Sequence, residues 1–93
     1  MATPESKVKA GIKAWLTKHK VWYCTPIGSQ FGNGGIPDFL CCHGGRLIGI
    51  EAKAPGKRAN TTDLQQRQLA AIQAAGGLAI VVDDVSQLEG LLT

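Results

Sequence analysis

The spacing of apolar residues near the N-terminus is the first strong pattern in the chain. Apolar residues recur there at helical spacing, at Val8, Ile12, Trp15 and Leu16. Thr3 and Pro4 come just before this stripe, and they are typical of a helix N-cap and of the first helical position. The pattern therefore predicts a first helix that begins at Pro4 and turns its apolar stripe toward a core.

Three short runs rich in β-branched and aromatic or aliphatic residues follow, at 21–25, 39–42 and 47–52, and each predicts a strand. Residues 26–37 separate the first two runs and contain four glycines, which indicates a loop. His43, Gly44 and Gly45 form a turn signal, so the second and third strands are expected to pair as a hairpin.

The C-terminal third predicts a helix, a strand and a final short helix. Residues 62–75 have an apolar face that includes Leu64, and Gly76 with Gly77 would end this helix. The nearly continuous apolar run Leu78–Val82 favours a buried central strand. Asp83 or Asp84 would then cap a last helix that reaches Leu92. The predicted fold is α/β, in the order αβββαβα.

Composition narrows the class of protein without identifying it. The 93 residues suit one domain, residues 1–93, and 44% of them are hydrophobic, which is enough for a packed core. Charged residues make up 18%, so the composition is not that of a disordered chain. The formal net charge of +3 fits a phosphate-rich partner and an ordinary basic surface equally well.

The cysteines indicate the redox compartment of the protein, and their pattern argues against disulfide bonds and a zinc site. Three cysteines, two of them adjacent, make a poor disulfide framework and favour a reducing compartment. Cys41, Cys42 and His43 could suggest zinc, but adjacent strand residues point to opposite faces, so small buried cysteines are favoured. Residues 1–20 do not resemble a signal peptide, and no apolar run is long enough for a membrane span. We therefore expect an intracellular, cytoplasmic protein with no membrane partner.

Two carboxylates at the ends of the predicted hairpin are the main candidates for chemistry. Asp38 opens the second strand and Glu51 lies near the end of the third, 13 positions later. In an antiparallel pair these two ends are adjacent, so the carboxylates can meet and hold a hard divalent cation. The alternative is a pair of ordinary surface acids, but the apolar run before Glu51 places it at the end of a buried strand.

Side-chain alternation adds further candidates. Glu51 and Lys53 point to the same face of a strand, so the Lys53 ammonium could stabilise the negative charge of a phosphoryl transition state. Ala52 points the other way into the core, and its backbone carbonyl remains available as a metal ligand.

Taken in order, these segments resemble the PD-(D/E)XK nuclease superfamily, and within it the VRR-NUC domain. The matching segments are Gly35-Ile36-Pro37-Asp38, Ile50-Glu51-Ala52-Lys53, and Thr62-Asp63-Leu64-Gln65 at the start of a helix that ends at Gly76. The resemblance implies a restriction-endonuclease-like core with a mixed sheet flanked by helices, and DNA hydrolysis dependent on Mg²⁺ or Mn²⁺.

The resemblance also implies roles for individual residues. Asp38 and Glu51 match the metal ligands of the family, Lys53 its catalytic lysine, and Gln65 a glutamine at the start of its second helix. Glu5 stands where related nucleases carry a first-helix acid that reaches the metal, although a Glu in a first turn also favours the helix dipole without any further role.

Residues near these positions are candidates for contacts with DNA. Lys57 and Arg58 follow the catalytic strand and could hold a phosphate, or could simply be a solvated basic loop. Gln68 lies one helical turn after Gln65 and could share its face, whereas Gln66 should point elsewhere. Two further candidates, in the glycine-rich loop, are Gln30 and Asn33.

By analogy with small free-standing members of the family, we expect a structure-selective endonuclease that acts as a homodimer on branched DNA such as a Holliday junction. Two alternatives remain open from the sequence. One is a nicking or restriction-like nuclease on ordinary duplex, and the other is a DNA-binding module without turnover. A phage or mobile-element setting suits a nuclease of this size.

Overall fold

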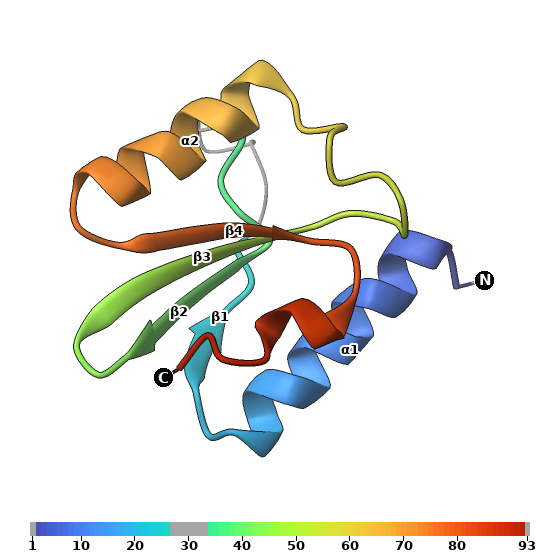
Figure 1. Cartoon of the computed structure of the whole chain (residues 1–93), viewed down its shortest axis with the longest axis horizontal. Coiled ribbons are helices and arrows are strands. Elements are labelled where there is room, and N and C mark those ends of the chain that lie inside the picture. Colours follow the sequence, from blue (N-terminus) through green and yellow to red (C-terminus); the bar gives the residue numbers. More distant parts are fainter. Residues whose placement is uncertain (1, 27–33, 93) are drawn as a thin grey trace.

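The computed structural model describes residues 2–26 and 34–92. Figure 1 shows their arrangement as a sheet between layers of helix. In chain order the elements are α1 (Pro4–Lys18), β1 (Trp22–Cys24), β2 (Phe39–His43), β3 (Arg46–Ala52), α2 (Asp63–Ala74), β4 (Leu78–Val82) and the 3₁₀ helix η2 (Val85–Leu88). The predicted order of elements is therefore confirmed for these residues, with 3₁₀ geometry in the last element.

The sheet is mixed and has the strand order β1-β2-β3-β4. The first two pairings, β1 with β2 and β2 with β3, are antiparallel. Helix α2 carries the chain across the sheet between β3 and β4, so these two strands pair in parallel. The chain is thus an α/β domain with a mixed sheet, as the sequence predicts.

Helices cover both faces of this sheet. Helix α1 and η2 pack on one face, and α2 lies on the other (Figure 1). Ile12, Trp15 and Leu16 of α1 are buried in the main core, which confirms the helical stripe. The strand residues that share this core are Phe39, Cys41, Ile48, Ile50, Ala52 and Val82.

Local polar contacts define where α1 begins. The Thr3 hydroxyl accepts a hydrogen bond from the Ser6 backbone amide at 3.1 Å, and the Ser6 hydroxyl accepts one from the Thr3 amide at 2.8 Å. This reciprocal capping box satisfies two amides that lack a helical partner, with Pro4 as the first helical residue. The predicted helix start is confirmed.

The hairpin between β2 and β3 is tighter than the sequence suggests. His43 pairs with Arg46, so both strands extend one residue further than predicted and His43 belongs to a strand. Only Gly44 and Gly45 form the turn, with φ of +61° and +78°. Positive φ at both central positions is the geometry whose twist matches that of the flanking strands.

Two predictions about the C-terminal region were wrong. Strand β4 is an edge strand of the described sheet rather than a central one. Its apolar run is explained by contacts on both faces, since η2 packs against one side of β4 and α2 against the other. The last helix is the single 3₁₀ turn η2, capped by Asp84, and does not reach Leu92. Gly90 follows it with a φ of +82°, a conformation that does not continue a helix.

Two further details differ from the predictions, namely the length of β1 and the exposure of Leu64. Strand β1 contains three residues, 22–24, which is shorter than the predicted 21–25. The Leu64 side chain is 54% exposed, although the pattern placed it on the apolar face of α2. Among the described residues, no helix is long and apolar enough to cross a membrane.

Candidate active site

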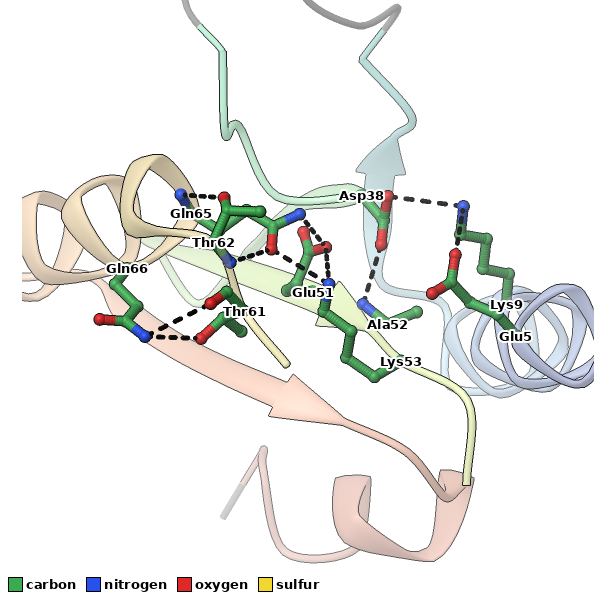
Figure 2. A network of polar contacts seen from close by, with 10 residues as sticks. All are labelled: Glu5, Lys9, Asp38, Glu51, Ala52, Lys53, Thr61, Thr62, Gln65 and Gln66. Carbon is green, nitrogen blue, oxygen red and sulfur yellow. Dashed lines mark hydrogen bonds and ion pairs between the residues drawn. The ribbon is translucent and has the colours of Figure 1, made fainter. Parts of the chain in front are cut away.

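Glu51 is the centre of a polar network at the end of β3 (Figure 2). Its side chain is among the most buried polar groups of the described residues, with the residue only 3% exposed. Glu51 Oε2 accepts a hydrogen bond from Gln65 Nε2 at 2.9 Å and lies 3.8 Å from Lys53 Nζ. Because Glu51 and Lys53 are two positions apart on an extended chain, they face the same side, as predicted.

Gln65 is oriented by the start of α2. Thr62 caps this helix, its hydroxyl accepting from the Gln65 amide at 3.1 Å, while Gln65 Oε1 accepts from the Thr62 amide at 2.9 Å. The same Gln65 oxygen accepts a hydrogen bond from Lys53 Nζ at 3.1 Å. The helix cap therefore fixes an amide that contacts both Glu51 and Lys53.

Asp38 enters the site from the neighbouring strand. Phe39 pairs with Ile50, so Asp38, one residue earlier, lies opposite Glu51. Asp38 Oδ2 accepts a hydrogen bond from the Ala52 amide at 2.9 Å. The amide and carbonyl of one strand residue point toward the same neighbouring strand, so the Ala52 carbonyl faces the side of Asp38. The structure thus brings together Asp38, Glu51, Ala52, Lys53 and Gln65.

The electrostatics of the pair are unfavourable for two ionised carboxylates. Burial, and then the negative charge of Asp38, raise the pKa of Glu51 from about 4.5 to about 7, against the opposing effect of Lys53. A divalent cation between the two carboxylates would relieve this repulsion.

The segment that leads into Asp38 is docked against the beginning of α2. Gln68 Nε2 donates to the Gly34 carbonyl at 3.5 Å, so the predicted DNA contact of Gln68 would compete with this bond. Gly35 has a φ of +82°, and a Cβ built there would lie 2.5 Å from the Leu64 carbonyl carbon. Helix α2 therefore positions both carboxylates, Glu51 through Gln65 and Asp38 through this close backbone contact.

Glu5 lies at the edge of the site and reaches Asp38 only through a lysine. Lys9 Nζ is 3.6 Å from Glu5 Oε2 and 3.6 Å from Asp38 Oδ1. Within residues 2–26 and 34–92, no group of three or more His, Cys, Asp or Glu side chains is close enough to hold a metal ion. The i to i+4 spacing of Glu5 and Lys9 could have indicated the first contact, but the Lys9 contact with Asp38 depends on tertiary structure.

The remaining candidates lie around this centre. Lys57 and Arg58 are exposed, and Arg58 Nε donates to the Val81 carbonyl at 3.2 Å. Gln66 points away from Glu51 and donates to the Thr61 hydroxyl at 3.0 Å, as expected. Gln30 and Asn33 lie outside the described residues.

The cysteines of β2 are separated by the alternation of the strand. Cys41 lies in the core, where burial and nearby Cys24 raise the pKa of its thiol to about 11. Cys42 is exposed on the opposite face. They do not converge on one point.

The oxygen donors at this end of the sheet suit a hard divalent cation. Asp38 and Glu51 supply carboxylates, and the Ala52 carbonyl faces the same side, while water molecules would complete the coordination that Mg²⁺ or Mn²⁺ prefers. The donor chemistry therefore fits the metal that the sequence predicts.

Comparisons with known proteins do not assign the chain to a family. No family model matches it, and no curated protein matches its sequence. The function must therefore be argued from the fold and from the site.

Proposed function

We propose that this protein is a metal-dependent endonuclease that hydrolyses phosphodiester bonds in DNA. The observation that carries the proposal is the convergence of Lys53 and Gln65 on the buried Glu51, with Asp38 opposite on the adjacent strand. Structural ion pairs are usually exposed, whereas here one carboxylate is buried next to a second one. Such an arrangement is unfavourable for stability and is explained by a function.

Each side chain of the site has a separate role in the proposed hydrolysis. Asp38, Glu51 and the Ala52 carbonyl would hold Mg²⁺ or Mn²⁺, and the bound cation would supply Lewis-acid chemistry, polarising the phosphate and making a water molecule more acidic. Lys53 places an ammonium beside the scissile phosphate and stabilises the charge that develops in the transition state. Gln65 accepts a hydrogen bond from the Lys53 ammonium through Oε1 and donates one to Glu51 through Nε2. Because it orients both side chains, we assign Gln65 a positioning role.

The fold supports a place in the PD-(D/E)XK superfamily and, within it, near the VRR-NUC domain. The order of helices and strands and the mixed sheet agree with the restriction-endonuclease-like core expected from the motifs. The proposal is also supported by the position of Asp38 and Glu51 at adjacent ends of the paired strands β2 and β3. Such a nuclease would act on intracellular DNA.

For the substrate we propose branched DNA, cut by a homodimer. An exposed apolar patch supports the dimer: Trp22 is 63% exposed and Leu47 is 44% exposed, and both pair with Cys42 of the strand between them. An exposed cluster of this kind is typical of a protein interface. Light scattering at several protein concentrations tests this part, with Trp22→Lys expected to yield monomers.

The test of function is a cleavage panel with the purified chain. A four-way junction, a flap and a linear duplex of the same sequence are incubated with Mg²⁺, Mn²⁺ or chelator. We expect metal-dependent cleavage of the junction in preference to the duplex. Equal cleavage of the duplex would support the nicking or restriction-like alternative, and metal-dependent binding without cleavage would support the DNA-binding module.

Substitutions of single residues test the role proposed for each side chain of the site. Asp38→Asn, Glu51→Gln and Lys53→Met should each reduce the cleavage rate by at least about a hundredfold, the scale seen when a charge-stabilising group is removed. Matched controls are Glu89→Gln and Lys7→Met, which remove exposed charges away from the site and should cleave like wild type. Wild-type activity in Asp38→Asn or Lys53→Met would refute the residue assignment.

A further inference from the structure

A groove runs along α1 and opens beside Asp38. It has a volume of about 890 Å³ and lies between α1 and the backbone that leaves β1 and enters β2. The helix contributes Lys9, Lys13 and Lys18 to its lining, and the opposite wall includes Thr25 and Phe39. Asp38 also lines it, so the groove is continuous with the candidate active site.

Lysines occur along the length of the groove, from Lys9 in the first half of α1 to Lys18 at its C-terminal end. At a helical rise of 1.5 Å per residue, Lys9 and Lys18 are separated by about 13 Å along the axis of α1. The only acid among the described lining residues is Asp38, which we assign to the metal.

Lys13 and Lys18 are free for an external partner. Both are exposed, and neither forms an ion pair with an acidic side chain anywhere in residues 2–26 or 34–92. Lys9 differs, because it contacts Asp38 and Glu5 and so marks the junction between groove and site (Figure 2).

The uncharged lining of the groove combines apolar residues with a few hydroxyl groups. Ala10 and Ala14 lie on the same wall as the lysines and leave room for the sugar and phosphate to approach the helix. Ser6, Thr17 and Thr25 provide hydroxyl groups that can donate to phosphate oxygens. Lysines, hydroxyl groups and small residues therefore occur together in the lining of the groove.

We propose that this groove binds one strand of the DNA substrate through its phosphates and leads that strand to Asp38. The inference rests on the proposed nuclease function and adds to it the path of the substrate on the protein. Lys13 and Lys18 bind phosphates away from the scissile bond, so they position the strand without taking part in the chemistry. Such contacts carry no sequence information and suit an enzyme that selects DNA by shape.

Binding is tested separately from cleavage, by replacing Mg²⁺ with Ca²⁺ and following a fluorescein-labelled four-way junction by anisotropy. The test variant is Lys13→Gln/Lys18→Gln, and the matched control Lys7→Gln changes an exposed lysine of the same helix that does not line the groove. Each lost phosphate contact should weaken binding about eightfold at 0.1 M salt and reduce the slope of log K against log salt by about 0.9.

The expected result is weaker binding and a lower salt slope for the double variant, with Lys7→Gln equal to wild type. If the double variant had the affinity and the salt slope of wild type, the proposal that the groove binds DNA would be overturned. A loss of log K in Lys7→Gln equal to half of that in the double variant would also overturn it, since one charge is removed instead of two and the effect would then report net charge alone. A change in molecular mass by light scattering would identify a second copy of the chain as the occupant and would refute the proposal as well.

Two failures remain distinguishable. If wild type neither binds nor cuts DNA, the proposed function fails, and the inference with it. If wild type binds and cuts DNA but the double variant does so equally well, only the path of the strand is wrong. Circular dichroism of the variants verifies that exposed substitutions on α1 leave the helix intact.

Discussion

The buried Glu51 should make the protein less stable as its carboxyl group ionises, and Glu51→Gln should remove that cost. Glutamine has nearly the same shape and keeps an oxygen that can accept from Gln65 Nε2, but it carries no charge to repel Asp38. We therefore expect Glu51→Gln to be inactive and, without metal, more stable than wild type at alkaline pH. Stability and activity should change in opposite directions.

The magnitude follows from the pKa of Glu51, which folding raises from about 4.5 to about 7. For an acid whose pKa is raised, the folded state binds more protons than the unfolded state between these two values, so stability falls as pH rises through this range. Each pH unit between the two pKa values corresponds to about 1.4 kcal/mol. Between about pH 5 and about pH 8, wild type should therefore lose on the order of 2 to 3 kcal/mol because of this group.

The assay is urea unfolding of wild type and Glu51→Gln in chelator, at several pH values and one protein concentration. The free energy of unfolding of Glu51→Gln, relative to that of wild type, should increase as pH rises, with most of the increase above about pH 5. Mg²⁺ should then stabilise wild type at alkaline pH and leave Glu51→Gln unchanged, because only the ionised carboxylate binds the cation. Glu89→Gln, which alters an exposed carboxyl group, serves as the control.

The reasoning would be refuted if Glu51→Gln followed wild type at every pH, or if it became less stable than wild type as pH rises. The first result would mean that the carboxyl group ionises as in the unfolded chain, and the second that the charge stabilises the fold through Lys53. An equal response of both proteins to Mg²⁺ would refute the assignment of Glu51 as a ligand.

Two further predictions concern the backbone that supports the site. Gly35→Ala should lower the free energy of unfolding by at least about 2 kcal/mol in urea, since its Cβ would overlap the Leu64 backbone; Gly45→Ala, whose φ of +78° is similar but whose surroundings are open, should lose only about 1 kcal/mol. Thr62→Ala should lose about 1 kcal/mol, because the Gln65 backbone amide loses the hydroxyl that accepts its hydrogen bond at the start of α2. The Thr62 backbone amide still donates to Gln65 Oε1, so any fall in kcat in a cleavage assay should be small; a loss as large as that of Lys53→Met would contradict a positioning role for Gln65.

The local elements were largely predictable because they depend on neighbouring residues. The capping sequence at Thr3 and the apolar stripe after it specify α1, and two consecutive glycines specify the hairpin turn. The sequence also predicts that Glu51 of β3 and Lys53, just after it, face the same side, since that follows from the alternation of side chains along an extended chain. These inferences require no knowledge of distant contacts.

Other features depend on which segments meet, and the sequence alone did not predict them. The apolar run of β4 suggested a central strand, but an edge strand covered by helices on both faces requires the same residues. The Lys9 contact with Asp38 and the close approach of Gly35 to Leu64 join segments that are far apart in the chain. No local pattern marks them.

For the site, the sequence by itself determined the kinds of groups and their faces: two acids, a lysine and a glutamine at a helix start. The tertiary structure decided their electrostatic state. Only packing could bury Glu51 beside Asp38 and raise its pKa, and only the docking of α2 could bring Gln65 within hydrogen-bonding distance of both Glu51 and Lys53. Charge identity is a property of each residue, whereas desolvation and close contact arise when the elements pack together.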